Sequence, residues 1–193
     1  MKLLICPGIH ASELTAQFLP PVLARLPLEP EQVWVRPAGY SALCAGELLH
    51  FLERQGPPAA IGSLSIVAFS AGVVGAAIAS ALWQQRGGQL ACLVAIDGWG
   101  VPLSAAWPVY RLSHDWFTHW SSDWLGSGTA SFYAEPSAEH LALWQRPQRV
   151  WGWRTESVAA TDTSSELRSR VNAADFIAEV LTGANVGANF KKT

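Results

Sequence analysis

Residues 64–72 read LSIVAFSAG, an apolar run that passes through Ser70 into two small residues and then into an alanine-rich segment. The apolar run predicts a buried strand, and the segment 73–85 predicts a helix. Ser70 therefore stands at a strand-to-helix corner, where its Oγ is lifted clear of the sheet and backbone N–H groups of the helix N-terminus lie nearby. This placement is typical of a nucleophile, although serine is also a common helix N-cap.

The alternation of strand and helix continues on both sides of this corner. The pattern predicts strands at residues 3–6, 32–36 and 91–96, and helices at 12–26 and 42–54. Apolar strands without polar alternation are typical of a parallel sheet that is covered on both faces. We therefore predict an α/β fold with three layers, in which helices flank a mostly parallel sheet.

The second half of the chain is less regular. Six of the ten tryptophans lie between Trp99 and Trp144, and residues 100–146 predict an irregular, lid-like excursion with one or two helices. A final amphipathic helix is expected at 167–181. We predict one domain over residues 1–183, followed by a frayed tail at 184–193.

Composition excludes several classes of protein. The net charge of −2 provides no basic surface for nucleic acid, and no glycine run has the spacing of a nucleotide-binding loop. No run approaches the length of a membrane span, and the first apolar run is too short for a signal peptide. The cysteines Cys6, Cys44 and Cys92 are odd in number and widely spaced, which is typical of free thiols in a reducing compartment. We therefore expect a cytoplasmic protein.

Two segments resemble motifs of the α/β-hydrolase superfamily. Residues 68–72, AFSAG, resemble its nucleophile elbow, with Ala68 where glycine is more usual. Residues 4–10, LICPGIH, resemble the first strand and the loop that supplies part of the oxyanion hole, with proline where histidine is more usual. The resemblance implies that the N–H groups of Ile9 and Ala71 would hold an oxyanion.

A third segment, residues 139–150, resembles the stretch around the catalytic histidine of small lipases and esterases. By this resemblance His140 is the base that would take the proton of Ser70. His114 and His119 are alternatives, because two histidines and an aspartate within so short a stretch are unusual. The same pair predicts a metal site only weakly, since i and i+5 on a helix point to different faces.

The acid that orients the base is expected at the carboxyl end of a strand. Asp97 directly follows the predicted strand 91–96, on the side of the sheet where open α/β folds bind ligands. Asp115 and Asp123 are alternatives, and Asp97 followed by glycine is also a common turn.

These residues predict a serine hydrolase that cleaves a small-molecule ester or thioester with an apolar portion, without a cofactor or metal. His10, Trp99 and Trp116 are expected to line its substrate pocket. The alternative is a non-catalytic protein of the same fold that binds a hydrophobic ligand or a protein partner through its Trp-rich segment.

Overall fold

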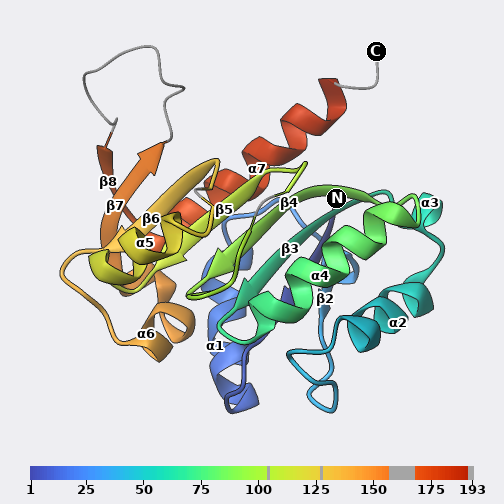
Figure 1. The fold of residues 1–193 in the computed structure, drawn as a ribbon, viewed down its shortest axis with the longest axis horizontal. Helices are drawn as coiled ribbons and strands as arrows, with labels where there is room; N and C mark the ends of the chain where they lie inside the picture. The colour runs from blue at the N-terminus through green and yellow to red at the C-terminus, as the bar shows by residue number, and fades with distance from the viewer. Residues whose placement is uncertain (104, 127, 157–167, 191–193) are drawn as a thin grey trace.

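The computed structural model describes residues 1–103, 105–126, 128–156 and 168–190. Its strands form one sheet of eight, in the order β2-β1-β3-β4-β5-β6-β7-β8 (Figure 1). The strands are β1 (Lys2–Cys6), β2 (Val33–Val35), β3 (Ser63–Phe69), β4 (Gln89–Ile96), β5 (Val109–Ser113), β6 (Ala130–Ala134), β7 (Trp151–Glu156) and β8 (Arg168–Asn172).

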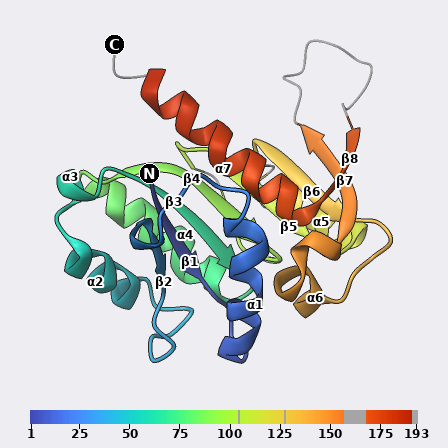
Figure 2. The ribbon, with the colours of Figure 1, turned by 180° about the vertical axis from the view of Figure 1, so that it is seen from behind.

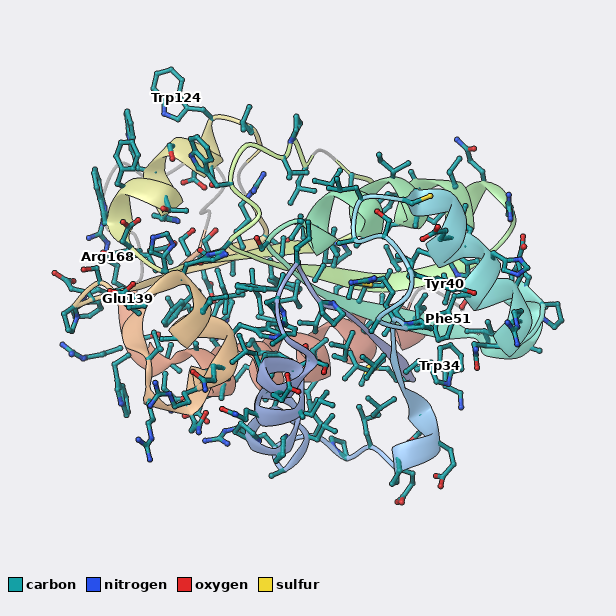
Figure 3. All side chains as sticks on the ribbon, turned by 90° about the horizontal axis from the view of Figure 1, so that it is seen from below. Trp34, Tyr40, Phe51, Trp124, Glu139 and Arg168 are labelled. Atoms are coloured by element: carbon teal, nitrogen blue, oxygen red, sulfur yellow. The ribbon has the colours of Figure 1, made fainter. Side chains whose placement is uncertain are left out.

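Helices cover both faces of the sheet, as the sequence predicts. They are α1 (Ser12–Leu23), α2 (Ala45–Gln55), α3 (Pro58–Ile61), α4 (Gly72–Gln85), α5 (Trp116–Asp123), α6 (His140–Gln145) and α7 (Ala173–Phe190), with short 3-10 turns at Pro30–Gln32 and Pro147–Arg149. In Figure 3 the cyan, green and yellow helices α2, α4 and α5 lie above the sheet, and α1, α6 and α7 lie below it. Figure 2 shows α1 and α7 crossing the second face.

The strands β1 to β6 run parallel, whereas β7 is antiparallel to β6 and β8 is antiparallel to β7. The carboxyl ends of β3, β4, β5 and β6 therefore meet at one edge of the sheet. Loops that follow adjacent parallel strands converge there, and this edge is where open α/β sheets bind ligands.

The two faces of the sheet bury separate apolar cores. On β3, Ile66 and Ala68 face the core under α2 and α4, whereas Val67 and Phe69 face the core under α1 and α7. A strand that is apolar on both faces fits only the interior of such a sheet. Burial of these side chains explains why β3 is apolar on both faces from Ile66 to Phe69.

Cysteine burial agrees with the expectation of free thiols. Cys6 and Cys92 are buried and Cys44 is exposed, and none of the three forms a disulfide. Burial raises the pKa of both the Cys6 and the Cys92 thiol to about 12. The two buried cysteines therefore act as small apolar side chains of the sheet.

The structure corrects the prediction for the second half of the chain. Residues 100–146, expected as an irregular lid-like excursion with one or two helices, contain two helices, α5 and α6, but also the strands β5 and β6 of the central sheet. The last helix begins at Ala173 rather than at 167, because β8 precedes it, and it continues to Phe190. Residues 184–190, expected as tail, are therefore helical in their backbone, and 191–193 lie outside the described residues.

Candidate active site

Four polar residues follow four neighbouring strands at one edge of the sheet. Ser70 follows β3, Asp97 follows β4, His114 follows β5, and His140 opens α6 after the loop that leaves β6. Because these strands are parallel and adjacent, their carboxyl ends bring residues that are up to 70 positions apart into contact.

Ser70, His140 and Asp97 form a continuous chain of hydrogen bonds. His140 Nε2 lies 3.2 Å from Ser70 Oγ, and His140 Nδ1 lies 2.8 Å from Asp97 Oδ2. A carboxylate only accepts hydrogen bonds, so His140 Nδ1 carries the proton that is donated to Asp97. In the neutral ring Nε2 is then the acceptor for the Ser70 hydroxyl proton.

The corner at Ser70 has the backbone geometry that lifts its side chain out of the sheet. Ser70 has a φ of 52°, a left-handed conformation that costs a non-glycine residue about 1–3 kcal/mol. Its N–H donates to the carbonyl of Ile96 at 2.8 Å, which joins the corner to the end of β4. The surrounding sheet thus holds a conformation that the residue alone would not adopt.

Small residues around the corner permit a close backbone approach. A Cβ on Gly72 would lie 2.4 Å from the carbonyl oxygen of Cys6 and 2.6 Å from that of Pro7. A Cβ on Gly8 would lie 3.0 Å from the Ser70 Cβ. The loop after β1 can therefore approach the corner only because both positions are glycine.

Asp97 is the buried carboxylate of the site, with 6% of its surface exposed. Burial by itself raises the pKa of Asp97, but hydrogen bonds from His114 and His140 outweigh that effect and hold the pKa below its ordinary value. The Asp97 backbone is also left-handed, with a φ of 49°, and its N–H donates to the carbonyl of Leu112 at 2.8 Å. Asp97 is therefore an anion at neutral pH in a fixed orientation.

His114 is a second partner of the same carboxylate. Its Nδ1 lies 3.0 Å from Asp97 Oδ2, and its backbone N–H donates to Oδ1 at 2.9 Å. The hydrogen bond to Asp97 raises the pKa of His114 above its ordinary value. The carbonyl of His114 also accepts from the N–H of Ala138 at 2.8 Å, which fixes the loop that leads to His140.

The ring of His140 packs on an apolar surface. It stacks on the buried ring of Phe69, with centroids 4.7 Å apart and an interplanar angle of 24°. Phe69 directly precedes Ser70, so the same strand end presents the hydroxyl and supports the imidazole. This contact restricts the ring to the plane in which its two nitrogens reach Ser70 and Asp97.

The two predicted oxyanion donors flank the Ser70 corner. Ala71 lines the cavity at Ser70, and Ile9 lies in the loop that Gly8 brings against Ser70. Among the hydrogen bonds of the described residues, none uses the N–H of Ile9 or of Ala71. Both donors are thus free for a ligand, whereas the N–H of Ser70 is occupied by Ile96.

A cavity of about 420 Å³ opens at these groups. Its walls combine the four polar residues with apolar side chains, among them Val74, Trp99, Val101 and Phe117. Trp99, predicted as a pocket residue, lines this cavity, whereas Trp116 lines a neighbouring one with Phe117. His10 lines a third cavity, which the loop at Gly8 also borders. Phe117 has no distinguishing signal in the sequence, because only the position of α5 brings it to the site.

The remaining candidates lie away from Ser70. His119 stacks on Tyr133 at a centroid distance of 5.1 Å and lies 3.8 Å from Asp123. Asp115 caps α5 by accepting from the N–H of Thr118 at 2.7 Å. Neither His119 nor Asp115 lines the cavity at Ser70.

Asp97, His114 and His140 also offer three possible metal ligands. One ligand atom from each lies within 4.8 Å of the others. In the present arrangement, however, both imidazoles aim Nδ1 at the same oxygen, Asp97 Oδ2, at hydrogen-bond distance. This donor set fits two protonated nitrogens on one carboxylate better than three lone pairs on a common ion.

No protein-family model matches the chain, and a search of the curated proteins found no match either. No helix in the described part of the chain has the length and apolar character needed to cross a membrane. Function is therefore inferred from the residues of the site.

Proposed function

We propose that this protein is a serine hydrolase of the α/β-hydrolase type, acting on an ester or thioester with an apolar portion. The observation that supports the proposal is the chain of contacts from Ser70 Oγ through both nitrogens of His140 to Asp97. A serine hydroxyl is a weak nucleophile at neutral pH, and an adjacent base that is oriented by a carboxylate removes that limitation.

In the proposed mechanism His140 Nε2 takes the proton from Ser70 as Oγ attacks the carbonyl carbon of the substrate. The buried negative charge of Asp97 stabilises the imidazolium that forms. The free N–H groups of Ile9 and Ala71 hold the developing oxyanion, and each such donor contributes about 2.7–4 kcal/mol in comparable sites. His140 then protonates the leaving group, and water releases the acyl group by the reverse sequence.

The walls of the cavity support the substrate class. Trp99, Val101 and Phe117 provide apolar contacts beside Ser70, and a volume of about 420 Å³ suits a small acyl or leaving group. The proposed reaction requires no cofactor.

Labelling with a fluorophosphonate tests this proposal, because the probe reacts only with an activated serine. We expect the wild-type protein to be labelled at Ser70 and the Ser70→Ala variant to lose both the label and the hydrolysis of short acyl esters. Ser169→Ala, at an exposed position of β8, is the matched control and is expected to keep both. Esterase activity that survives unchanged in Ser70→Ala would falsify the mechanism.

The second candidate is a non-catalytic protein of the same fold that binds a hydrophobic ligand or a protein partner. The observation that favours it is the exposed aromatic cluster of α5 and its flanks, which contains Trp116, Phe117, Trp120 and Trp124. A folded wild-type protein that takes no fluorophosphonate label would support this candidate over the hydrolase.

A further inference from the structure

The cavity that His10 lines, of about 710 Å³, borders the loop that carries Ile9, one of the two predicted oxyanion donors. It is bounded by that loop, α1 and the loop that follows β2, and it is open to solvent. Apolar side chains form much of its wall, including Ile9, Leu19 and Val35. No aspartate or glutamate of the described residues lines it, although the carboxylate of Glu47 lies close by and accepts from the N–H of Ser41, a residue of the wall.

Arg36 introduces a positive charge into this wall. Only 7% of its surface is exposed, and it forms no ion pair with any residue in the described ranges. Glu47 attracts it from beyond ion-pair distance, and the neighbouring Cys6 is a neutral thiol at physiological pH, because burial raises its pKa to about 12. The charge of Arg36 thus has no anion in contact with it.

The hydrogen bonds of Arg36 leave part of its guanidinium unused. Nη2 donates to the carbonyl of Pro7 at 2.9 Å, and Nη1 donates to the carbonyls of Pro37 and Tyr40. Nε is buried and has no hydrogen-bond partner among the described residues. Carbonyls satisfy donors without carrying net charge, whereas a buried cation is stabilised most by a carboxylate or phosphate.

We propose that this cavity binds a carboxylate carried on an apolar chain, with Arg36 as its counter-ion. A single guanidinium in an apolar wall matches a monoanion with a hydrocarbon chain better than it matches a dianionic phosphate. That the carboxylate belongs to the substrate rests on the proposed hydrolase function, whereas the binding itself does not require Ser70 to react.

The position of Arg36 connects this cavity to the candidate active site. The carbonyl of Pro7, which accepts from Arg36, is the same group that lies against Gly72 two residues after Ser70. Gly8 and Ile9 line the cavity, and Gly8 also lies against Ser70. A ligand whose carboxylate lies at Arg36 therefore has its chain beside the loop that would hold the oxyanion.

The test is an NMR titration with two probes of equal size, hexanoate and the neutral hexanamide. The Nε–H resonance of Arg36, assigned by its loss in Arg36→Lys, reports on the guanidinium of this wall residue. We expect hexanoate to shift this resonance and to bind at least about tenfold more tightly than hexanamide, as charge-assisted hydrogen bonds would require.

Arg36 also holds the loop at Pro7, so a substitution of Arg36 could disturb the fold. The second pair of variants therefore changes Ala38, an exposed residue at the wall of the cavity. Ala38→Glu is expected to weaken hexanoate binding about fivefold by charge repulsion and to leave hexanamide binding unaltered. Ala38→Gln, of the same size, is expected to keep the wild-type preference for hexanoate.

Equal affinities for the two probes overturn the inference, as do shifts that are confined to the surroundings of Ser70. Fluorophosphonate labelling separates this inference from the proposed function. If the protein binds hexanoate at Arg36 but takes no label, the carboxylate site is supported and the hydrolase proposal fails. If the protein is labelled but shows no preference for hexanoate, only the proposal of a carboxylate site fails.

Discussion

His114 holds both carboxylate oxygens of Asp97: its backbone N–H donates to Oδ1 at 2.9 Å, and its Nδ1 lies 3.0 Å from Oδ2. Oδ2 is also the atom that His140 contacts at 2.8 Å. Two imidazoles therefore share one buried charge, and only one of them reaches Ser70. His114 orients the carboxylate, and the carboxylate orients His140.

The first prediction concerns the pH dependence of stability. The pKa of His114 is raised in the folded protein above its ordinary value of 6.5, because the imidazolium gains a hydrogen bond to Asp97. A raised pKa stabilises the fold fully below pH 6.5, and this contribution is lost as the pH rises through the folded value. The gap in unfolding free energy between wild type and His114→Asn should therefore be largest in mild acid and shrink toward alkaline pH.

Denaturant titrations across the pH range measure this gap. At the acid end, the contribution of Asp97 disappears as the pH falls below its ordinary pKa of 3.8 and through its lowered folded value. His50→Asn, at an exposed position of α2, is the matched control. A gap in unfolding free energy that widens with rising pH would contradict a stabilising interaction between the His114 imidazolium and the Asp97 carboxylate.

The second prediction identifies the acid. Asp97→Asn removes the charge that would stabilise the His140 imidazolium, and kcat should fall by about 10⁴-fold, as it does when the acid of comparable triads is replaced by its amide. Asp115→Asn is the control, because asparagine also caps helices and Asp115 lies at the start of α5. Comparable losses in both variants, measured on one short acyl ester, would reject Asp97 as the specific acid.

The third prediction concerns the packing of the corner. Gly72→Ala places a Cβ within 2.4 Å of the Cys6 carbonyl, and the backbone must shift to accept it. We expect the free energy of unfolding to fall by about 1–3 kcal/mol. Gly39→Ala has no atom within 4 Å of its new Cβ and should cost far less. Equal stability of the two variants in thermal or urea unfolding would show that the loop after β1 can shift to accept the new Cβ at no cost in free energy.

The fourth prediction concerns the apolar wall beside Ser70. Phe117 and Trp99 line the cavity there, whereas Trp124 lies at the far end of α5, where 77% of its surface is exposed (Figure 3). Phe117→Ala and Trp99→Ala should each lower kcat/KM by about tenfold for an ester with a butyl or longer acyl chain, and less for acetate. Trp124→Ala should leave the dependence on chain length unchanged. If kcat/KM depended on acyl-chain length in the same way in all three variants, the acyl chain would not bind against Phe117 and Trp99.

The local pattern of the first 97 residues predicts the structure well. The strands β1, β2, β3 and β4 and the helices α1, α2 and α4 lie where apolar periodicity places them, within a few residues, whereas the short helix α3 is not predicted. The pattern fails for β5 and β6, because Val109–Ser113 and Ala130–Ala134 are short and carry Arg111 and Ser131 within buried strands. Arg111 is tolerated there because its guanidinium donates to the carbonyls of Val101, Leu125 and Gly126. Those partners are distant in sequence, so no local pattern could reveal the strand.

By itself the sequence determined the α/β class and the strand-to-helix corner at Ser70, because apolar periodicity and small residues act over a few positions. Only the tertiary structure decided which histidine meets Ser70. His114 and His140 both follow strands of the same sheet, and both reach Asp97. His140 reaches Ser70, and His114 does not, because the His140 ring stacks on Phe69 and the hydrogen bond at Ala138 fixes the loop that leads to it. Residues 139–150 indicate His140 only through their resemblance to a known motif, whereas the position of its ring depends on contacts between segments far apart in the chain.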